Sequence, residues 1–206
     1  NRHKQKISKW IRDVHLIKRV GLISGIIAPW WWAGMIALCA SLWPHYDHTQ
    51  QFISELGAHG SPTQTLMVWG GFYVTGVLYA LFGAALLLTN PQQKLAQVAA
   101  LVIVLAGIAR LGTGYFSCEA GCNDVAGSID HLWHHIFARA GYGSLVLSTL
   151  LWGIYCLRAR QKTFALYSFI TVALAAVALG LLQNSIESRI DSGLYQRLVT
   201  LVLSSW

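Results

Sequence analysis

Five long apolar runs indicate that most of this chain of 206 residues is surrounded by lipid and not by water. The runs are Val20–Trp43, Thr63–Thr89, Leu95–Phe116, His131–Leu157 and Thr163–Leu182. Each run has at least the roughly 20 residues that an α-helix needs to cross a hydrocarbon core of about 30 Å. Only 11% of the residues are charged, whereas soluble domains carry roughly a quarter. The sequence therefore predicts an all-α polytopic membrane bundle.

The last segment, Leu194–Trp206, is apolar but short. We predict that it is a sixth span, with a short interfacial helix as the alternative. Pro29 lies inside the first run, where a membrane helix tolerates it as a kink. The spans fill nearly the whole chain, so we expect one transmembrane domain over residues 1–206, with the bundle itself over 20–206.

Residues 1–19 differ from the spans because cations alternate with apolar side chains. The apolar positions at helical spacing are Ile7, Trp10, Ile11, Val14 and Ile17. This pattern is typical of an amphipathic helix that lies in the membrane interface. A solvated basic tail is the alternative.

Charge is divided unevenly between the links. The N-terminal segment and the links 90–94 and 158–162 carry 7 + 1 + 3 = 11 of the 15 Lys and Arg residues. Seven of the eight acidic residues fall in the other links, 44–62, 117–130 and 183–193. The positive-inside rule therefore predicts a cytoplasmic N-terminus and acidic outer links. Cations placed in this way face anionic lipids, so we expect membrane lipids and no nucleic acid as partners.

Six of the eight histidines fall on the predicted outer side: His45, His48, His59, His131, His134 and His135. Neutral imidazole, thiolate and carboxylate are good ligands for zinc or a related divalent transition metal. We therefore predict a metal site built from some of His59, His131, His134 and His135. His131 and His135 are four residues apart and share one helical face, although the Glu of a metalloprotease helix is missing. In the alternative, water and a helix N-terminus capped by Asp130 satisfy these side chains.

Two cysteines, Cys118 and Cys122, lie in an outer loop. An oxidising compartment favours a disulfide between them at least as much as their use as metal ligands, and both interpretations stay open. Cys39 and Cys156 lie in apolar runs and are predicted to be buried thiols.

Two arginines, Arg110 and Arg139, interrupt apolar runs. A cation within the membrane is costly unless it is paired or faces a polar cavity. One prediction is an ion pair with Glu55, Glu119 or Asp124. The other is that these arginines bind an anionic head group, because a guanidinium fork matches phosphate geometry.

Three consecutive tryptophans, Trp30, Trp31 and Trp32, occupy the middle of the first run, away from the interface where Trp usually lies. We expect them to pack against lipid or other helices. Lining a pocket for an acyl chain or ring is the alternative.

Three stretches carry a resemblance to a bacterial family of integral membrane proteins, domain of unknown function 998. They are Gln51-Phe52-Ile53-Ser54-Glu55-Leu56-Gly57-Ala58-His59-Gly60-Ser61-Pro62, Tyr115-Phe116-Ser117-Cys118-Glu119-Ala120-Gly121-Cys122 and Gly193-Leu194-Tyr195-Gln196-Arg197. The resemblance implies six spans and the inner membrane of a bacterium, but no activity. A weaker similarity, through Ser54, His59, His131 and His135, links the chain to the alkaline ceramidase and adiponectin-receptor superfamily and hints at lipid chemistry.

Three functions remain open on the sequence alone. The first is a metal-dependent enzyme, a lipid hydrolase or acyl transferase, acting on lipids or lipid-linked substrates at the outer face of the membrane. Glu55 or Asp130 would be its general base, Ser54 a nucleophile, and Arg110 and Arg139 would bind the substrate. The second is a lipid- or metal-binding accessory protein without turnover, and the third is a small transporter.

Overall fold

The computed structural model describes residues 2–122, 128–188 and 190–206, and every extended element in this part of the chain is helical. Five of its helical segments are long and apolar enough to cross a membrane. They are His15–Leu42, Gln64–Thr89, Lys94–Tyr115, Ile129–Arg158 and Lys162–Ser188. The prediction of an all-α membrane bundle is confirmed, and the chain is a multi-pass membrane protein.

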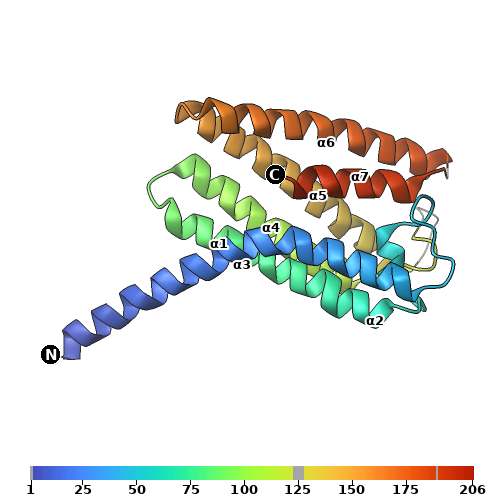
Figure 1. Ribbon diagram of the computed structural model, residues 1–206, viewed down its shortest axis with the longest axis horizontal. Coiled ribbons are helices and arrows are strands. Elements are labelled where there is room, and N and C mark those ends of the chain that lie inside the picture. Colours follow the sequence, from blue (N-terminus) through green and yellow to red (C-terminus); the bar gives the residue numbers. More distant parts are fainter. Residues whose placement is uncertain (1, 123–127, 189) are drawn as a thin grey trace.

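The first helix, α1 (Arg2–Leu42), runs without a break through Pro29. Its N-terminal part continues beyond the bundle, and the helix bends where it reaches the bundle (Figure 1). The predicted interfacial helix over residues 1–19 is therefore an extension of the first span and not a separate element. The amphipathic side-chain pattern of residues 1–14 lies outside the described side chains.

The second span is one helix with an irregular interior. It consists of α2 (Gln64–Leu66), the π-helical segment η2 (Met67–Tyr73) and α3 (Val74–Thr89). A π-helical segment changes the direction of the side chains that follow it and often occurs at functional sites. Here it turns Phe72 inward, so that only 2% of this side chain is exposed.

Helix α4 (Lys94–Tyr115) packs closely on α3 because both helices carry glycine where they cross. A Cβ on Gly76 would lie 2.9 Å from the carbonyl oxygen of Gly107, and one on Gly107 would lie 2.6 Å from that of Gly76. Small residues at such crossings let membrane helices approach closely. The contact fixes α4, and with it Arg110, against the second span.

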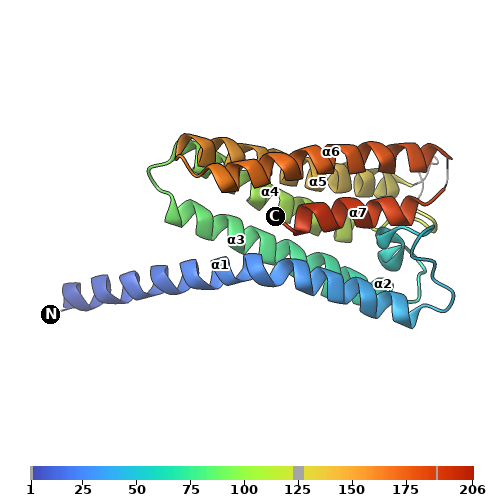
Figure 2. The same ribbon diagram turned by 45° about the horizontal axis from the view of Figure 1, so that its top comes forward.

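Helices α5 (Ile129–Arg158) and α6 (Lys162–Ser188) form a hairpin on the other side of the bundle. The predicted sixth span is α7 (Ser192–Ser204), whose thirteen residues extend about 20 Å. It packs against α6 and ends partway along the bundle, where the indole N–H of Trp206 donates to Ser168 Oγ at 2.9 Å (Figure 2). It is not among the five helices of spanning length.

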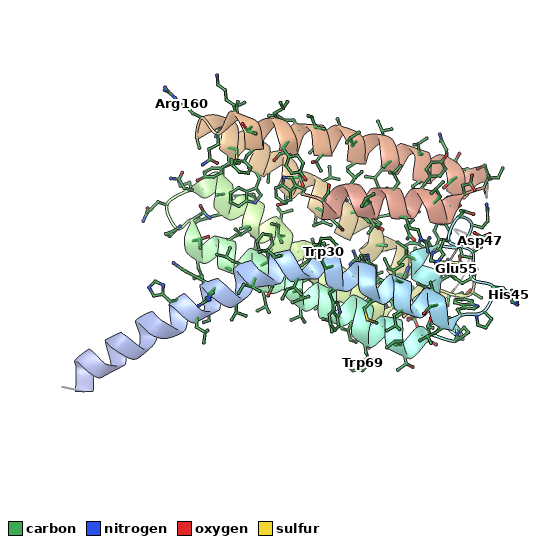
Figure 3. The ribbon with its side chains drawn as sticks, viewed as in Figure 1. Trp30, His45, Asp47, Glu55, Trp69 and Arg160 are labelled. Atoms are coloured by element: carbon green, nitrogen blue, oxygen red, sulfur yellow. A yellow bond between two sulfur atoms is a disulfide. The ribbon has the colours of Figure 1, made fainter. Side chains whose placement is uncertain are left out.

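The links lie at two opposite ends of the bundle, which we call the basic end and the acidic end. The basic end holds the short links between α3 and α4 and between α5 and α6, with Arg160 in the second of them (Figure 3). The acidic end holds the loops after α1, α4 and α6, and Figure 3 places Asp47 and Glu55 there. The predicted grouping of charges is thus present in space, and which end faces the cytoplasm stays a prediction.

Candidate functional site

The acidic end is held together by hydrogen bonds between segments far apart in the sequence. The loop after α1 contains a short 3₁₀-helix, η1 (Ile53–Gly57). Backbone N–H groups donate from Leu194 to Thr49 at 2.9 Å and from His59 to Cys118 at 2.8 Å. The loop after α1 is therefore fixed to the start of α7 on one side and to the loop after α4 on the other.

Arg197 is the centre of this loop network. Its guanidinium donates to the carbonyl oxygens of Gln51 at 3.0 Å and Gly193 at 2.9 Å, and to Tyr46 Oη at 2.8 Å. Burial raises the pKa of Tyr46 to about 12, with the Arg197 charge acting in the opposite direction. The Tyr46 hydroxyl therefore stays neutral, and it donates a hydrogen bond to the Phe52 carbonyl oxygen at 2.7 Å.

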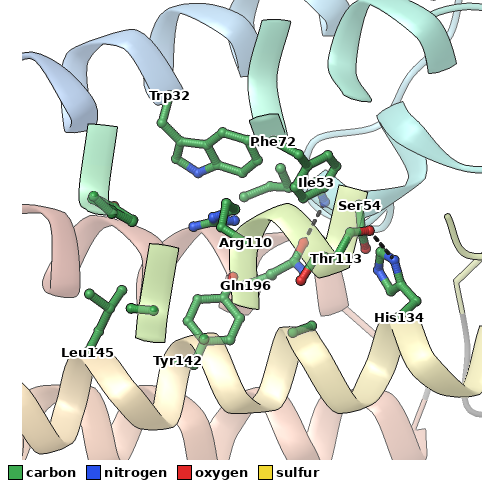
Figure 4. Close-up of a pocket in the computed structure, with 14 residues that line it drawn as sticks. Trp32, Ile53, Ser54, Phe72, Arg110, Thr113, His134, Tyr142, Leu145 and Gln196 are labelled. Atoms are coloured by element: carbon green, nitrogen blue, oxygen red, sulfur yellow. Dashed lines mark hydrogen bonds between the residues drawn. The ribbon is translucent and has the colours of Figure 1, made fainter. Parts of the chain in front are cut away.

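Behind this loop network lies a cavity that we call the arginine cavity (Figure 4). Its polar side chains come from every layer around it: Trp32, Ser54, Tyr79, Arg110, Thr113, His134, Tyr142 and Gln196. Its free volume of about 30 Å³ has room for about two water molecules, or for the oxygens of one carboxylate or phosphate group. No carboxylate lines it among the described residues.

Arg110 occupies this cavity about 8 Å before the end of α4, at 1.5 Å per residue. Its guanidinium carbon lies 4.2 Å from the centroid of the Trp32 ring and 5.9 Å from that of Phe72. In the described part of the chain it has no hydrogen bond and no ion pair. A cation–π contact contributes about 2 kcal/mol when desolvated, which is less than the roughly 3 kcal/mol that an arginine costs within a membrane.

Trp32 leaves a second donor without a partner in the same cavity. The side chain is 2% exposed, and its Nε1–H has no acceptor among the described residues. Figure 4 shows this nitrogen on the edge of the ring that faces the cavity. Its neighbours differ, because Trp31 donates to the Gly70 carbonyl at 2.7 Å and Trp30 is 78% exposed.

His134 is held in one tautomer. Its Nδ1 lies 3.0 Å from the Thr113 carbonyl oxygen and 2.8 Å from that of Phe116, at the end of α4. Carbonyl oxygens only accept, so Nδ1 carries the proton and Nε2 is left as the basic nitrogen. This arrangement orients a histidine for proton transfer or for binding a metal.

The two loop cysteines form a disulfide, Cys118–Cys122, with their Cα atoms 5.2 Å apart. Both are buried, and their sulfurs and a ring nitrogen of His134 all lie within 4.8 Å of one another. Among the described residues this is the group whose spacing suits a metal ion. Once the disulfide is reduced, two thiolates and an imidazole form a donor set that suits zinc.

His131 and His135 share one face of α5, as their spacing predicts. Their Nε2 atoms lie 3.1 Å apart, and the backbone N–H of Glu119 donates to His131 Nδ1 at 3.2 Å. His131 therefore carries its proton on Nε2 and donates it to His135. The four predicted histidines do not form one metal-binding group among the described residues. His59 is exposed and lies beside Gln64.

The two predicted general bases face the loops. Glu55 is buried and accepts from the backbone N–H of Phe52 at 2.8 Å and from the Gln51 side chain at 3.1 Å, so its carboxylate closes the η1 turn. The expected cap Asp130 lies in the first turn of α5, and the cap is Ser128, whose hydroxyl accepts from His131 N–H. That correction follows from the start of the helix at Ile129, two residues earlier than the sequence suggests.

A second cavity, of about 230 Å³, adjoins the first. The two share the side chains of Ser54, His134, Tyr142 and Gln196, and the second also contains His135 and Cys122. Arg139 lies on its wall and is exposed. The predicted residues Ser54, Arg110, Arg139, His134 and His135 are thus brought together around two adjoining spaces, whereas Asp124 lies outside the described residues.

Sequence reasoning missed several residues of the site. Gln196 reaches the cavity from α7 and accepts from the Ile53 backbone N–H, and Tyr142 comes from the middle of α5. The one available signal was the polarity of both residues within otherwise apolar segments.

Comparison with known proteins agrees with the resemblance seen in the sequence. The model of the family described as protein of unknown function DUF998 matches residues 26–206, and the chain belongs to this family. No curated protein and no solved structure matches the chain.

Proposed function

We propose that this membrane protein binds an anionic amphiphile of the bilayer, with the carboxylate or phosphate oxygens of the ligand on Arg110. The observation that carries the proposal is the state of that guanidinium. It lies within a membrane span, stacks on Trp32 and has no carboxylate partner in the described chain. A charge in this position is expected to have its counter-ion in a ligand.

Other features of the arginine cavity support an oxygen-rich anion. The unpartnered indole N–H of Trp32 offers a second donor beside the guanidinium. Thr113 and Gln196 add polar atoms, and no acidic side chain repels the ligand. The cavity lies beneath the acidic end, so a lipid in the leaflet on that side would bring its head group to this depth.

The test is an extraction of lipids from purified protein, followed by mass spectrometry. Wild-type protein is expected to retain an anionic lipid that Arg110→Gln loses. Arg158→Gln is the matched control, because it removes the same charge from an exposed position at the basic end of α5. Equal lipid content in Arg110→Gln and wild-type protein would refute the proposal.

The second candidate function is a metal-dependent lipid hydrolase or acyl transferase that acts on the bound amphiphile. His134 favours it, since its Nε2 is left basic and its side chain lines both cavities beside Ser54. In the reduced protein Cys118, Cys122 and His134 would hold zinc, which supplies a water of lowered pKa when a fourth position is open. In the protein without metal, Nε2 of His134 would instead be free to take the proton of an attacking hydroxyl.

Metal analysis of the purified protein tests whether the second candidate function depends on a metal. Protein treated with a phosphine reductant and then with zinc is expected to keep about one ion per chain, and His134→Ala to keep much less. The metal-dependent form of the second candidate fails if the reduced protein binds none. Release of fatty acid from phosphatidylglycerol vesicles, lost in Ser54→Ala, would support turnover with or without metal.

A further inference from the structure

A third, apolar cavity adjoins the arginine cavity on the side of the basic end. It has a volume of about 500 Å³ and is lined by residues of α1, α3, α4, α5, α6 and α7. Its walls are mainly hydrophobic and aromatic, with Leu22, Ile26, Phe82, Trp152 and Phe164 among them. Along α5 it runs from Leu145 to Cys156, which is about 16 Å at 1.5 Å per residue. We call it the tail cavity.

The tail cavity and the arginine cavity meet at two side chains. Tyr79 from α3 and Leu145 from α5 line both of them. Figure 4 places Leu145 at the end of the arginine cavity away from His134, on the same side as Arg110. These two side chains therefore lie at the boundary between the two cavities.

The tail cavity also opens towards the surrounding membrane. Ile26 and Phe164 belong to its wall and are 68% and 66% exposed. Ile26 lies well inside a membrane-spanning helix, so its exposed surface faces lipid chains, and Phe164 lies in the first turn of α6 at the basic end. A hydrocarbon chain is thus the occupant that this opening admits.

We infer that the ligand carries an apolar chain and that this chain lies in the tail cavity. The ligand would pass between Tyr79 and Leu145, so that its anionic group lies on Arg110. The inference rests on the proposed function and specifies its substrate class, an amphiphile with a single anionic group at the end of a long chain. The volume of the tail cavity is within the range of about 300–1,000 Å³ that is usual for small-molecule sites. The order of the cavities sets the orientation, with the anionic group nearer the acidic end and the chain directed towards the basic end.

The apolar chain contributes to ligand selectivity through its length and shape. A chain that leaves the bilayer for an apolar cavity gains little from the hydrophobic effect, because lipid is as apolar as the protein wall. Narrowing the tail cavity at Leu86, about 10 Å beyond Tyr79 along α3, should therefore exclude long-chain ligands by steric hindrance, while short ligands that do not extend this far are unaffected.

The experiment compares two probes in phosphatidylcholine nanodiscs, hexadecyl phosphate and butyl phosphate. Leu86→Trp is expected to weaken hexadecyl phosphate at least tenfold and to leave butyl phosphate within about twofold of wild type, because Leu86 lines the tail cavity but not the arginine cavity. Leu88→Trp is the matched control, because Leu88 is 39% exposed on the same helix and lines none of these cavities. It should change neither probe. Equal affinity of Leu86→Trp and wild type for hexadecyl phosphate would overturn the inference, and failure of wild type to bind either probe would overturn the proposed function instead.

A second measurement covers the case in which Leu86→Trp does not fold. A hexadecyl phosphate with a photoreactive diazirine in mid-chain should label wild-type peptides around Trp152 or Phe164. Labelling confined to lipid-facing residues outside the tail cavity, such as Leu174, would contradict the inference.

Discussion

Two arginines at the same end of the bundle stack on aromatic rings but differ in every other contact. Arg197 lies 5.5 Å from the Tyr46 ring centroid and donates three hydrogen bonds to oxygens of the chain. Arg110 lies 4.2 Å from the Trp32 centroid and has no hydrogen bond or ion pair in the described chain. Buried polar groups in folded proteins are nearly all satisfied, and each exception requires an explanation. Arg197 is thus explained by the fold, and Arg110 requires a ligand.

The surroundings of the two arginines repeat this difference. Around Arg197, the Gln50 amide donates to Asp191 Oδ1 at 2.7 Å, and the Asp191 backbone N–H donates to Gln50 Oε1 at 3.1 Å. Around Arg110, the Trp32 N–H also lacks an acceptor. The loop network therefore holds the site in place, and the cavity behind it keeps its donors for another molecule.

The largest expected effect on stability comes from Arg197→Gln. It should lower the free energy of unfolding by about 3 kcal/mol, because two carbonyl oxygens and a buried hydroxyl lose a charged donor. Thermal unfolding in detergent measures it. Arg158→Gln, at an exposed position, should stay within about 0.5 kcal/mol of wild type. A loss as small for Arg197→Gln would show that the loop network does not hold α7.

Gly193→Ala should weaken the same network by about 1–3 kcal/mol. Its Cβ would meet the carbonyl oxygen of Gln51, and it would lie 2.8 Å from that of His48, both of them backbone atoms. Gly180→Ala is the control, because nothing lies within 4 Å of its Cβ. It should be neutral or slightly stabilising, as alanine is in helices. Equal behaviour of the two variants would mean that the start of α7 tolerates displacement.

Trp32→Phe should affect the ligand and spare the fold. Phenylalanine keeps a ring under Arg110 but loses the N–H that has no acceptor in the described chain. Affinity for butyl phosphate should fall about tenfold, as for one hydrogen bond to a charged group. Calorimetric titration in nanodiscs measures it, with Trp31→Phe as the comparison outside the arginine cavity. Unchanged affinity in Trp32→Phe would remove the indole from the site.

The smallest effect concerns Asp47, in the loop network. Hydrogen bonds from the Thr49 hydroxyl and backbone N–H, then from Gln50 N–H, hold its pKa below the usual 3.8. A carboxyl group whose pKa falls on folding stabilises the fold above its unfolded pKa, and this contribution is lost as pH falls through the folded pKa. Wild-type protein should therefore lose stability slightly more than Asp47→Asn below about pH 4. Parallel pH profiles of the two unfolding midpoints would contradict this account.

The sequence predicts the features that follow from hydropathy and spacing. The spans, the uninterrupted helix at Pro29, the two charged ends and the shared face of His131 and His135 are all present. These features depend on local composition or on helical periodicity, and neither requires knowledge of how the helices pack.

The remaining features depend on packing between distant segments. Ser54 faces the cavities while its neighbour Glu55 closes a turn, which follows from the position of the 3₁₀-helix against α7. The tautomer of His134 is set by two carbonyls at the end of α4, and two of the three partners of Arg197, Tyr46 and Gln51, lie about 150 residues earlier in the chain. No spacing rule within one helix could have indicated these contacts.

The most direct test of the central claim is the stability of delipidated protein carrying Arg110→Gln. If the counter-ion of Arg110 belongs to a ligand, removing the charge should leave unfolding unchanged or make the protein more stable, while Arg197→Gln unfolds at a clearly lower temperature. Adding butyl phosphate should then stabilise wild-type protein and not Arg110→Gln. The account is contradicted if Arg110→Gln destabilises the delipidated protein as much as Arg197→Gln does, because Arg110 would then have its partner within the chain.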